Sequence, residues 1–119
     1  MSELFPVRIY HNPNCSTSRK ALDAARASGR PVEVVEYMKA GWSRDLLTGL
    51  LDRMKARPRD ILRTRNTQAD GLGLTAPDAS DDAILSAMIA DPVLVERPIV
   101  ETEKGAVLAR PIEKMDEVL

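Results

Sequence analysis

Residues 7–19 have the sequence VRIYHNPNCSTSR and contain a predicted change from strand to helix. Alternating apolar residues over positions 5–10 predict a short strand, and Asn12-Pro13-Asn14 ends it. Residues 19–27 favour a helix. Cys15, the only cysteine of the chain, therefore lies at the start of that helix. Unpaired backbone N–H groups and the positive end of the helix dipole favour a thiolate there, so the sequence predicts a reactive cysteine.

A second strand follows this helix. Gly29 is placed where a helix-ending glycine is common, and Pro31 prevents the helix from continuing. Residues 32–37 are then expected to form a second, largely buried strand. Strand, helix and strand in this order form a βαβ unit, which predicts a parallel strand pair joined by a right-handed crossover.

The middle of the chain, about residues 43–91, is expected to be a helical insertion. Ser43 is a candidate N-cap with Trp42 packed against Leu47, Pro58 starts a short helix that reaches residue 62, and Ser80 caps a third helix that Asp91-Pro92 ends. Residues 67–79 are expected to be a loop. The apolar positions predicted to face inward are Leu46, Leu47, Leu50, Leu51 and Met54 in the first helix and Ile84, Leu85, Met88 and Ile89 in the third.

The last part of the chain predicts a β-hairpin and, after it, a short helix over residues 112–119. The apolar runs 98–101 and 106–109 flank a turn with Gly105 in its fourth position. A turn centred between residues 103 and 104 makes paired positions sum to 207, so Arg97 faces Arg110. Two like charges opposed on a sheet repel unless an anion lies between them, which makes this pair a candidate anion clamp.

Together these elements predict an α/β fold with a mixed sheet, in which a βαβ unit and a β-hairpin flank the helical insertion. The 119 residues fit one domain, over residues 1–119. The net charge is −1, from 17 basic and 18 acidic residues, which gives no reason to expect nucleic acid or membrane as a partner. The single cysteine and the absence of signal-peptide features predict a cytoplasmic protein.

Cys15 has two interpretations, a small buried apolar residue or a nucleophile, and its place at the helix start favours the nucleophile. Ser18 stands where a Cys-x-x-Cys motif would have its second thiol, so the site is monothiol and its resolving thiol must come from outside. A cysteine-dependent phosphatase is excluded because its loop needs an arginine six residues after the cysteine, where this chain has Ala21. His11, the only histidine, rules out a metal-binding histidine cluster but could assist thiolate formation.

Four motifs resemble the glutaredoxin-linked arsenate reductase (ArsC) family, in the expected order and spacing. They are residues 10–19, 61–63, 96–100 and 109–111, and the resemblance extends from about residue 7 to residue 119. The chain is especially similar to the shorter ArsC-like proteins of bacteria. This resemblance implies a thioredoxin-like fold with a helical insertion. One departure is Ser16, which stands where the family usually has glycine.

The resemblance also implies roles for individual residues. Cys15 resembles the family's nucleophile, Ser18 the residue that hydrogen-bonds it and His11 the histidine that influences its ionisation. Pro98 resembles the cis-proline that faces the active-site loop. The family's arginines that hold the oxyanion correspond by this resemblance to Arg63, Arg97 and Arg110.

The function that these features predict is reduction of arsenate to arsenite. Cys15 would attack the arsenic, glutathione would act as co-substrate and a glutaredoxin would resolve the mixed disulfide, with no bound cofactor and no metal. The alternatives are a regulator similar to Spx that binds RNA polymerase, which Ser18 disfavours because such proteins commonly use Cys-x-x-Cys, and a monothiol reductase of another oxidant. The latter would share Cys15 but would not need three arginines.

Overall fold

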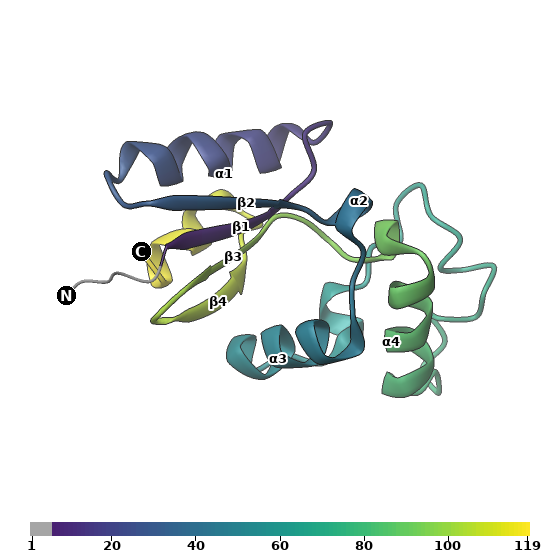
Figure 1. Ribbon diagram of the computed structural model, residues 1–119. Helices are drawn as coiled ribbons and strands as arrows, with labels where there is room; N and C mark the ends of the chain where they lie inside the picture. The colour runs from purple at the N-terminus through teal and green to yellow at the C-terminus, as the bar shows by residue number, and fades with distance from the viewer. Residues whose placement is uncertain (1–5) are drawn as a thin grey trace. The chain divides into compact units, whose positions relative to one another are not determined.

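The computed structural model describes residues 6–119, which form two compact units. One unit contains the chain up to Ala40 together with Arg97–Leu119, and the other contains Gly41–Glu96. We call them the sheet unit and the helical unit; Figure 1 shows the chain leaving the first, forming the second and returning. The helical unit corresponds to the expected insertion at about 43–91. That residues 1–119 make one domain stays a prediction.

The sheet unit is built on a four-stranded mixed sheet. Its strands lie in the order β2-β1-β3-β4, with β1 parallel to β2, β1 antiparallel to β3 and β3 antiparallel to β4. The predicted parallel pair and hairpin are therefore confirmed. The elements of this unit are β1 (Val7–His11), α1 (Ser16–Ala27), β2 (Val32–Glu36), α2 (Tyr37–Ala40), β3 (Ile99–Thr102), β4 (Gly105–Leu108) and the 3-10 helix η3 (Ile112–Glu117).

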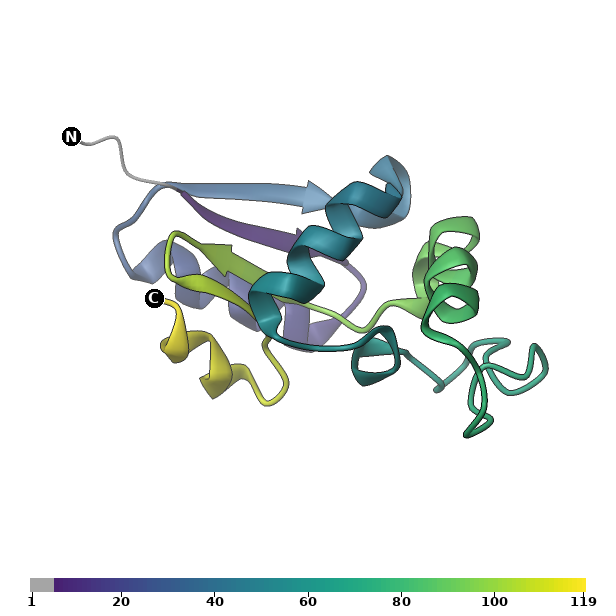
Figure 2. The ribbon, with the colours of Figure 1, turned by 90° about the horizontal axis from the view of Figure 1, so that it is seen from below.

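One face of this sheet is covered by α1 and η3. Figure 1 shows α1 lying along the sheet, and Figure 2 shows η3 beside the hairpin. Small side chains on α1 allow the helix to lie close to the strands, and η3 fills the remaining area with larger ones. The buried residues of this core are Val7 and Ile9 from β1, Ala21 and Ala25 from α1, Val100 from β3, and Ala109, Met115 and Val118 from the C-terminal part.

Three details of the sheet unit differ from the sequence-based expectations. The predicted strand 5–10 is found at residues 7–11, and Phe5 lies outside the described residues. The strand β2 is an edge strand rather than a largely buried one, with Val34 37% exposed, and it ends before Tyr37. An apolar run does not distinguish an edge strand from a central one, because its length and β-branched residues suit both.

The helix α1 begins at Ser16, three residues before the predicted start. Ser16, Thr17 and Ser18 have low helix propensity, but polar residues are well suited to a first turn, whose N–H groups have no partner within the helix. Cys15 is consequently the N-cap residue itself.

The helical unit contains the three predicted helices and one further short helix. They are α3 (Arg44–Met54), the 3-10 helices η1 (Pro58–Ile61) and η2 (Pro92–Leu94), and α4 (Asp81–Ala90). Both predicted N-caps are confirmed: the hydroxyl of Ser43 accepts a hydrogen bond from the Leu46 backbone N–H, and that of Ser80 accepts one from Ala83, each at 3.1 Å. Leu46 was wrongly expected to face inward, since it is 36% exposed.

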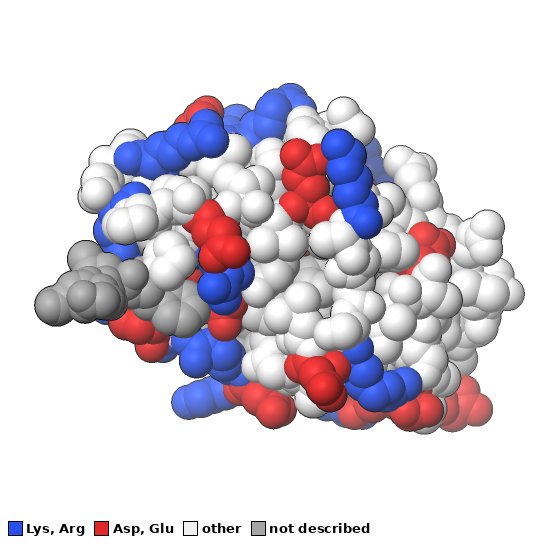
Figure 3. All heavy atoms as spheres, in the orientation of Figure 1, with Lys and Arg blue, Asp and Glu red and all other residues white. Residues whose placement is uncertain are grey.

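The loop over residues 67–79 forms turns without a helix or strand, as predicted. On the face drawn in Figure 3, basic and acidic side chains are interspersed, in line with the near-zero net charge. Over residues 6–119, no helix has the length and apolar character needed to cross a membrane.

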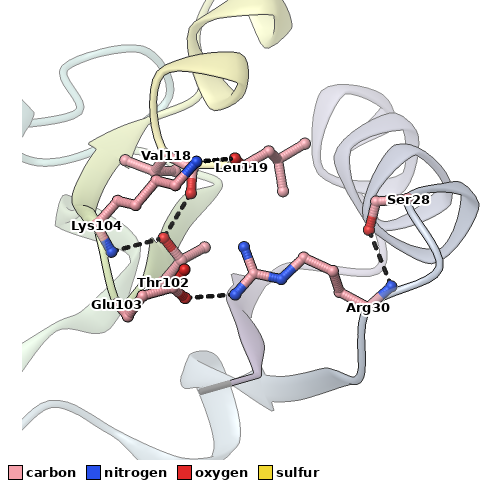
Figure 4. A network of polar contacts seen from close by, with 7 residues as sticks. All are labelled: Ser28, Arg30, Thr102, Glu103, Lys104, Val118 and Leu119. Atoms are coloured by element: carbon pink, nitrogen blue, oxygen red, sulfur yellow. Dashed lines mark hydrogen bonds and ion pairs between the residues drawn. The ribbon is translucent and has the colours of Figure 1, made fainter. Parts of the chain in front are cut away.

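Hydrogen bonds and an ion pair of side chains hold the β-hairpin at its turn (Figure 4). The Thr102 hydroxyl donates to the backbone carbonyl of Val118 at 2.5 Å and accepts from the Lys104 backbone N–H at 3.1 Å. Next to the turn, Arg30 forms an ion pair with Glu103. These contacts join the hairpin to the C-terminal residues and to the loop between α1 and β2, and therefore restrain the strands whose other ends carry Arg97 and Arg110.

Candidate active site

Cys15 occupies the N-cap position of α1, with extended backbone angles of φ −103° and ψ 122°. Its carbonyl accepts the first helical hydrogen bond from Arg19 N–H at 3.0 Å, and its own N–H donates to the Asn12 carbonyl at 3.0 Å. The Asn12 side chain in turn accepts from the Asn14 N–H at 2.9 Å. The loop 12–14 thereby holds the cysteine at the helix start, where it is partly exposed.

The surroundings of Cys15 favour its thiolate. Partial burial acts to raise the pKa of the thiol, but this is outweighed by hydrogen bonds from the Ser18 backbone N–H, from the Arg97 side chain and from the Thr17 backbone N–H, and by the charge of Arg97. The pKa of Cys15 is lowered as a result. Residue spacing alone does not reveal that Thr17 and Ser18 act through their backbone; the signal that could show it is their position in the first helical turn.

The hairpin brings Arg97 and Arg110 together beside this thiol. The β3–β4 register pairs Ile99 with Leu108, so paired positions sum to 207 as predicted. The Ala109 N–H donates to the Pro98 carbonyl at 2.9 Å, which continues the pairing toward the arginines. The bonds Arg97-Pro98 and Arg110-Pro111 are both cis, as the resemblance implied for Pro98.

The Arg110 guanidinium connects the two strands with the cysteine. Its Nη1 donates to the Arg97 carbonyl at 3.0 Å and lies 3.9 Å from the Cys15 Sγ. Because Arg97 also acts on the thiol, two guanidinium groups from the end of the hairpin meet one sulfur from the start of α1. Such a concentration of positive charge is stabilised by a thiolate and by an added oxyanion.

The donors of Arg97 are not all used by the protein. Its Nε and Nη1 atoms are buried and have no hydrogen-bond partner among residues 6–119. A buried charged donor without a partner is costly, and native proteins rarely tolerate one without a reason. Each of these free N–H groups can donate a charge-assisted hydrogen bond to an oxygen of an oxyanion, so Arg97 is suited to bind one.

His11 and Ser18 form a buried polar pair behind the cysteine. The Nδ1 atom of His11 lies 2.6 Å from the Ser18 hydroxyl, which also accepts from the Asn12 N–H at 3.0 Å. The Ser18 hydroxyl thus contacts the histidine, and its backbone N–H is the group that reaches Cys15. The predicted site residues His11, Cys15 and Ser18 are therefore brought together.

Burial lowers the pKa of His11, and Arg26 and Arg19 act in the same direction, while Glu36 opposes them. A lowered pKa keeps the imidazole neutral near pH 7. A neutral ring can accept a hydrogen bond from the Ser18 hydroxyl or donate one to the hydroxyl oxygen, depending on its tautomer. In either state it orients Ser18, whose N–H is bonded to the thiolate.

Arg63, the third predicted arginine, lies in the helical unit. Its Nη1 donates to the Glu96 carboxylate at 2.8 Å, and this ion pair is largely buried, with exposed fractions of 11% and 23% for the two side chains. The Arg63 N–H donates to the Leu94 carbonyl at 2.8 Å. Its charge is thus already paired, unlike that of Arg97.

The described residues offer no ligand set for a metal: within residues 6–119 there is no group of three or more histidine, cysteine, aspartate or glutamate side chains that could hold one.

Comparisons with known proteins identify the family of the chain. Residues 10–118 match the model of the ArsC family. The chain is 44% identical to arsenate reductase ArsI2 of Synechocystis sp., over 93% of this chain and 79% of that protein. It is 37% identical to the arsenate reductase of Escherichia coli, over 95% and 80%. Among solved structures, an arsenate reductase from Vibrio cholerae superposes with a TM-score of 0.91 at 34% identity, covering 98% of this chain and all of the other.

Proposed function

Because this chain belongs to the ArsC family, we propose that it is an enzyme that reduces arsenate to arsenite, with Cys15 as nucleophile. The observation that carries the proposal is the Arg97 guanidinium, which is buried beside the thiol with two unpartnered donors. An arsenate oxyanion placed against these donors would have its arsenic close to the Cys15 sulfur. The relatives named arsenate reductase support the choice of arsenate over other oxyanions.

In the first step the Cys15 thiolate attacks the arsenic of the bound arsenate. A sulfur–arsenic bond forms, and one arsenate oxygen takes up protons and leaves as water. Arsenic remains in the +5 state. Arg97 and Arg110 balance the negative charge of the oxyanion and of the adduct. We include Arg63 as a third oxyanion ligand on the family resemblance alone.

In the second step the thiolate of glutathione attacks the Cys15 sulfur of the adduct. A disulfide forms between Cys15 and glutathione, and the sulfur–arsenic bond breaks. The bonding electron pair stays on arsenic, which is released as arsenite in the +3 state, and the two thiols are oxidised. The second thiol must come from another molecule because Cys15 is the only cysteine of the chain, and we take it to be glutathione on the family resemblance alone.

In the third step a glutaredoxin thiolate attacks the glutathione sulfur of the mixed disulfide. Cys15 leaves as a thiolate and is ready for another turnover, and glutaredoxin carries the glutathione. Leaving is favoured by the same groups that lower the pKa of Cys15. We place the protein in the cytoplasm, where the glutathione pool keeps thiols reduced.

The purified protein tests this proposal directly in an assay with arsenate, glutathione and glutaredoxin, in which arsenite is quantified. We expect turnover by the wild type and none by Cys15→Ser. Ser16→Ala is the control, because it changes the neighbouring residue and keeps the thiol. Activity that persists in Cys15→Ser would exclude the mechanism, and an inactive wild type would exclude arsenate as the substrate.

The alternative function is a monothiol reductase of another oxidant. The need for the arginines distinguishes it from the proposed arsenate reductase. A neutral oxidant needs the thiolate but not an oxyanion site. We therefore expect Arg110→Ala to lose arsenate turnover and to keep its reaction with a neutral disulfide such as 2-hydroxyethyl disulfide. Arsenate turnover that survives Arg110→Ala would contradict an arginine-bound oxyanion and favour the alternative.

A further inference from the structure

A cavity of about 260 Å³ lies in the sheet unit, between the first turns of α1 and the segment that follows β4. Its lining residues are Thr17, Lys20, Arg110, Pro111, Ile112 and Glu113. Two of them also act on the nucleophile, since the Thr17 N–H bonds to the Cys15 thiolate and Arg110 Nη1 lies 3.9 Å from its sulfur. The cavity therefore adjoins the reacting sulfur.

Two charged residues that line this cavity form no ion pair among residues 6–119. Lys20 and Glu113 are exposed, and neither forms an ion pair in the described part of the chain, with each other or with another residue. Lys20 follows Thr17 by three residues, so both side chains lie on one face of α1. An ammonium and a carboxylate thus line one cavity without being joined, a pair of charges that complements a zwitterion.

We propose that this cavity is the binding site for glutathione, with Lys20 and Glu113 holding its γ-glutamyl end. That end carries a carboxylate and an ammonium on the same carbon atom, which complement the Lys20 ammonium and the Glu113 carboxylate. The inference rests on the proposed function, which needs glutathione to reach Cys15. The volume of about 260 Å³ lies just below the ~300–1,000 Å³ range of small-molecule sites, so the cavity has the size for one small ligand.

Apolar and backbone groups complete the match. Pro111 and Ile112 offer carbon surface to the middle of the tripeptide, and Thr17 marks the side on which the thiol must approach Cys15. Arg110 lines the cavity as well as the oxyanion site, so it borders both substrates. The sulfur of a glutathione bound this way would point toward the Cys15 adduct.

The test uses a reaction that needs no arsenate. The Cys15 thiolate attacks one sulfur of oxidised glutathione, a disulfide between Cys15 and glutathione forms, and one glutathione thiolate leaves. This product is the mixed disulfide of the proposed cycle, and mass spectrometry follows its formation. The same measurement with 2-hydroxyethyl disulfide, which has no charges, reports the intrinsic reactivity of Cys15.

We expect Lys20→Ala and Glu113→Ala each to slow the reaction with oxidised glutathione about two- to fivefold, and the double variant about tenfold, with the 2-hydroxyethyl disulfide rate unchanged. Lys114→Ala and Asp116→Ala are matched controls, because they change the net charge equally from exposed positions on η3 outside the cavity. Both side chains of the pair are exposed, so the variants are expected to fold, and circular dichroism checks this.

Equal rates for the cavity variants and their controls would overturn the subsite, as would equal slowing with both disulfides. Turnover with arsenate separates the two proposals. If the wild type does not reduce arsenate, the proposed function fails. The rates of the cavity variants with oxidised glutathione, compared with those of their controls, still test the glutathione subsite. If arsenate is reduced, we expect Lys20→Ala to raise the KM for glutathione without changing the kcat, and an unchanged KM would exclude the subsite alone.

Discussion

Arg97 and Arg63 are two predicted oxyanion ligands in different environments. Arg97, in the sheet unit, has two buried donors without a partner among the described residues and lowers the pKa of Cys15. Arg63, in the helical unit, is bound to the Glu96 carboxylate. An arginine with free donors gains hydrogen bonds when an anion arrives, whereas a paired arginine must exchange or share its carboxylate. The comparison therefore ranks Arg97 above Arg63 in its contribution to oxyanion binding.

The largest effect is expected for Arg97→Ala. It removes a preorganised charged donor from the place where the oxyanion is attacked, which should lower kcat/KM for arsenate by about 10²- to 10³-fold. Arg65→Ala, which removes an exposed arginine of the helical unit, serves as the control in the same steady-state assay. A loss below tenfold for Arg97→Ala would break the ranking.

A smaller effect, about tenfold in kcat/KM, is expected for Arg63→Ala, in keeping with the loss of one charged hydrogen bond. Arg65→Ala is its control, because Arg65 is exposed and two residues away. Glu96→Gln sharpens the comparison, since it frees the Arg63 guanidinium and should lower the KM for arsenate a few-fold. If Glu96→Gln instead raises that KM, Glu96 positions the Arg63 guanidinium for arsenate and does not compete with arsenate for it.

The placement of the residues around Cys15 in the sheet unit could be predicted from the sequence because it follows from local rules. A glycine-containing turn sets the hairpin register, and Arg97 and Arg110 meet just beyond the paired residues. Cys15 is placed by the strand-to-helix junction. In the helical unit the caps were predictable, but the Arg63–Glu96 ion pair was not, because its residues are 33 positions apart and no local pattern joins them.

Three other features could not be predicted from the sequence, because they too depend on contacts between distant parts of the chain or on side-chain directions. The edge position of β2 depends on strand order, which a βαβ pattern leaves open. Lys20 and Glu113 look like any solvated charges until the fold places them on one cavity. The pairing of Ser18 with His11, rather than through its hydroxyl with Cys15, depends on side-chain directions at the helix start.

The smallest effect concerns stability in the helical unit. Lys55 ends α3 in the left-handed conformation, at φ 56° and ψ 45°, which glycine adopts without strain. Lys55→Gly should raise the free energy of unfolding by about 1 kcal/mol, measured as a higher urea midpoint. Ala56→Gly is the control and should not stabilise. Since Lys55 is remote in sequence from the thiol chemistry, the rate of Cys15 alkylation should stay constant, and a changed rate would show that the two units are coupled.

The pH dependence of Cys15 alkylation by iodoacetamide tests the central claim most directly, because only the thiolate reacts. Since the pKa of Cys15 is lowered, the midpoint of the wild-type rate should lie at a lower pH than that of an ordinary cysteine, whose pKa is ~8.5. Arg97→Met removes the charge that favours the thiolate, so its midpoint should move to higher pH. A wild-type midpoint at or above the ordinary value, or one that Arg97→Met leaves in place, would contradict an arginine-activated thiolate.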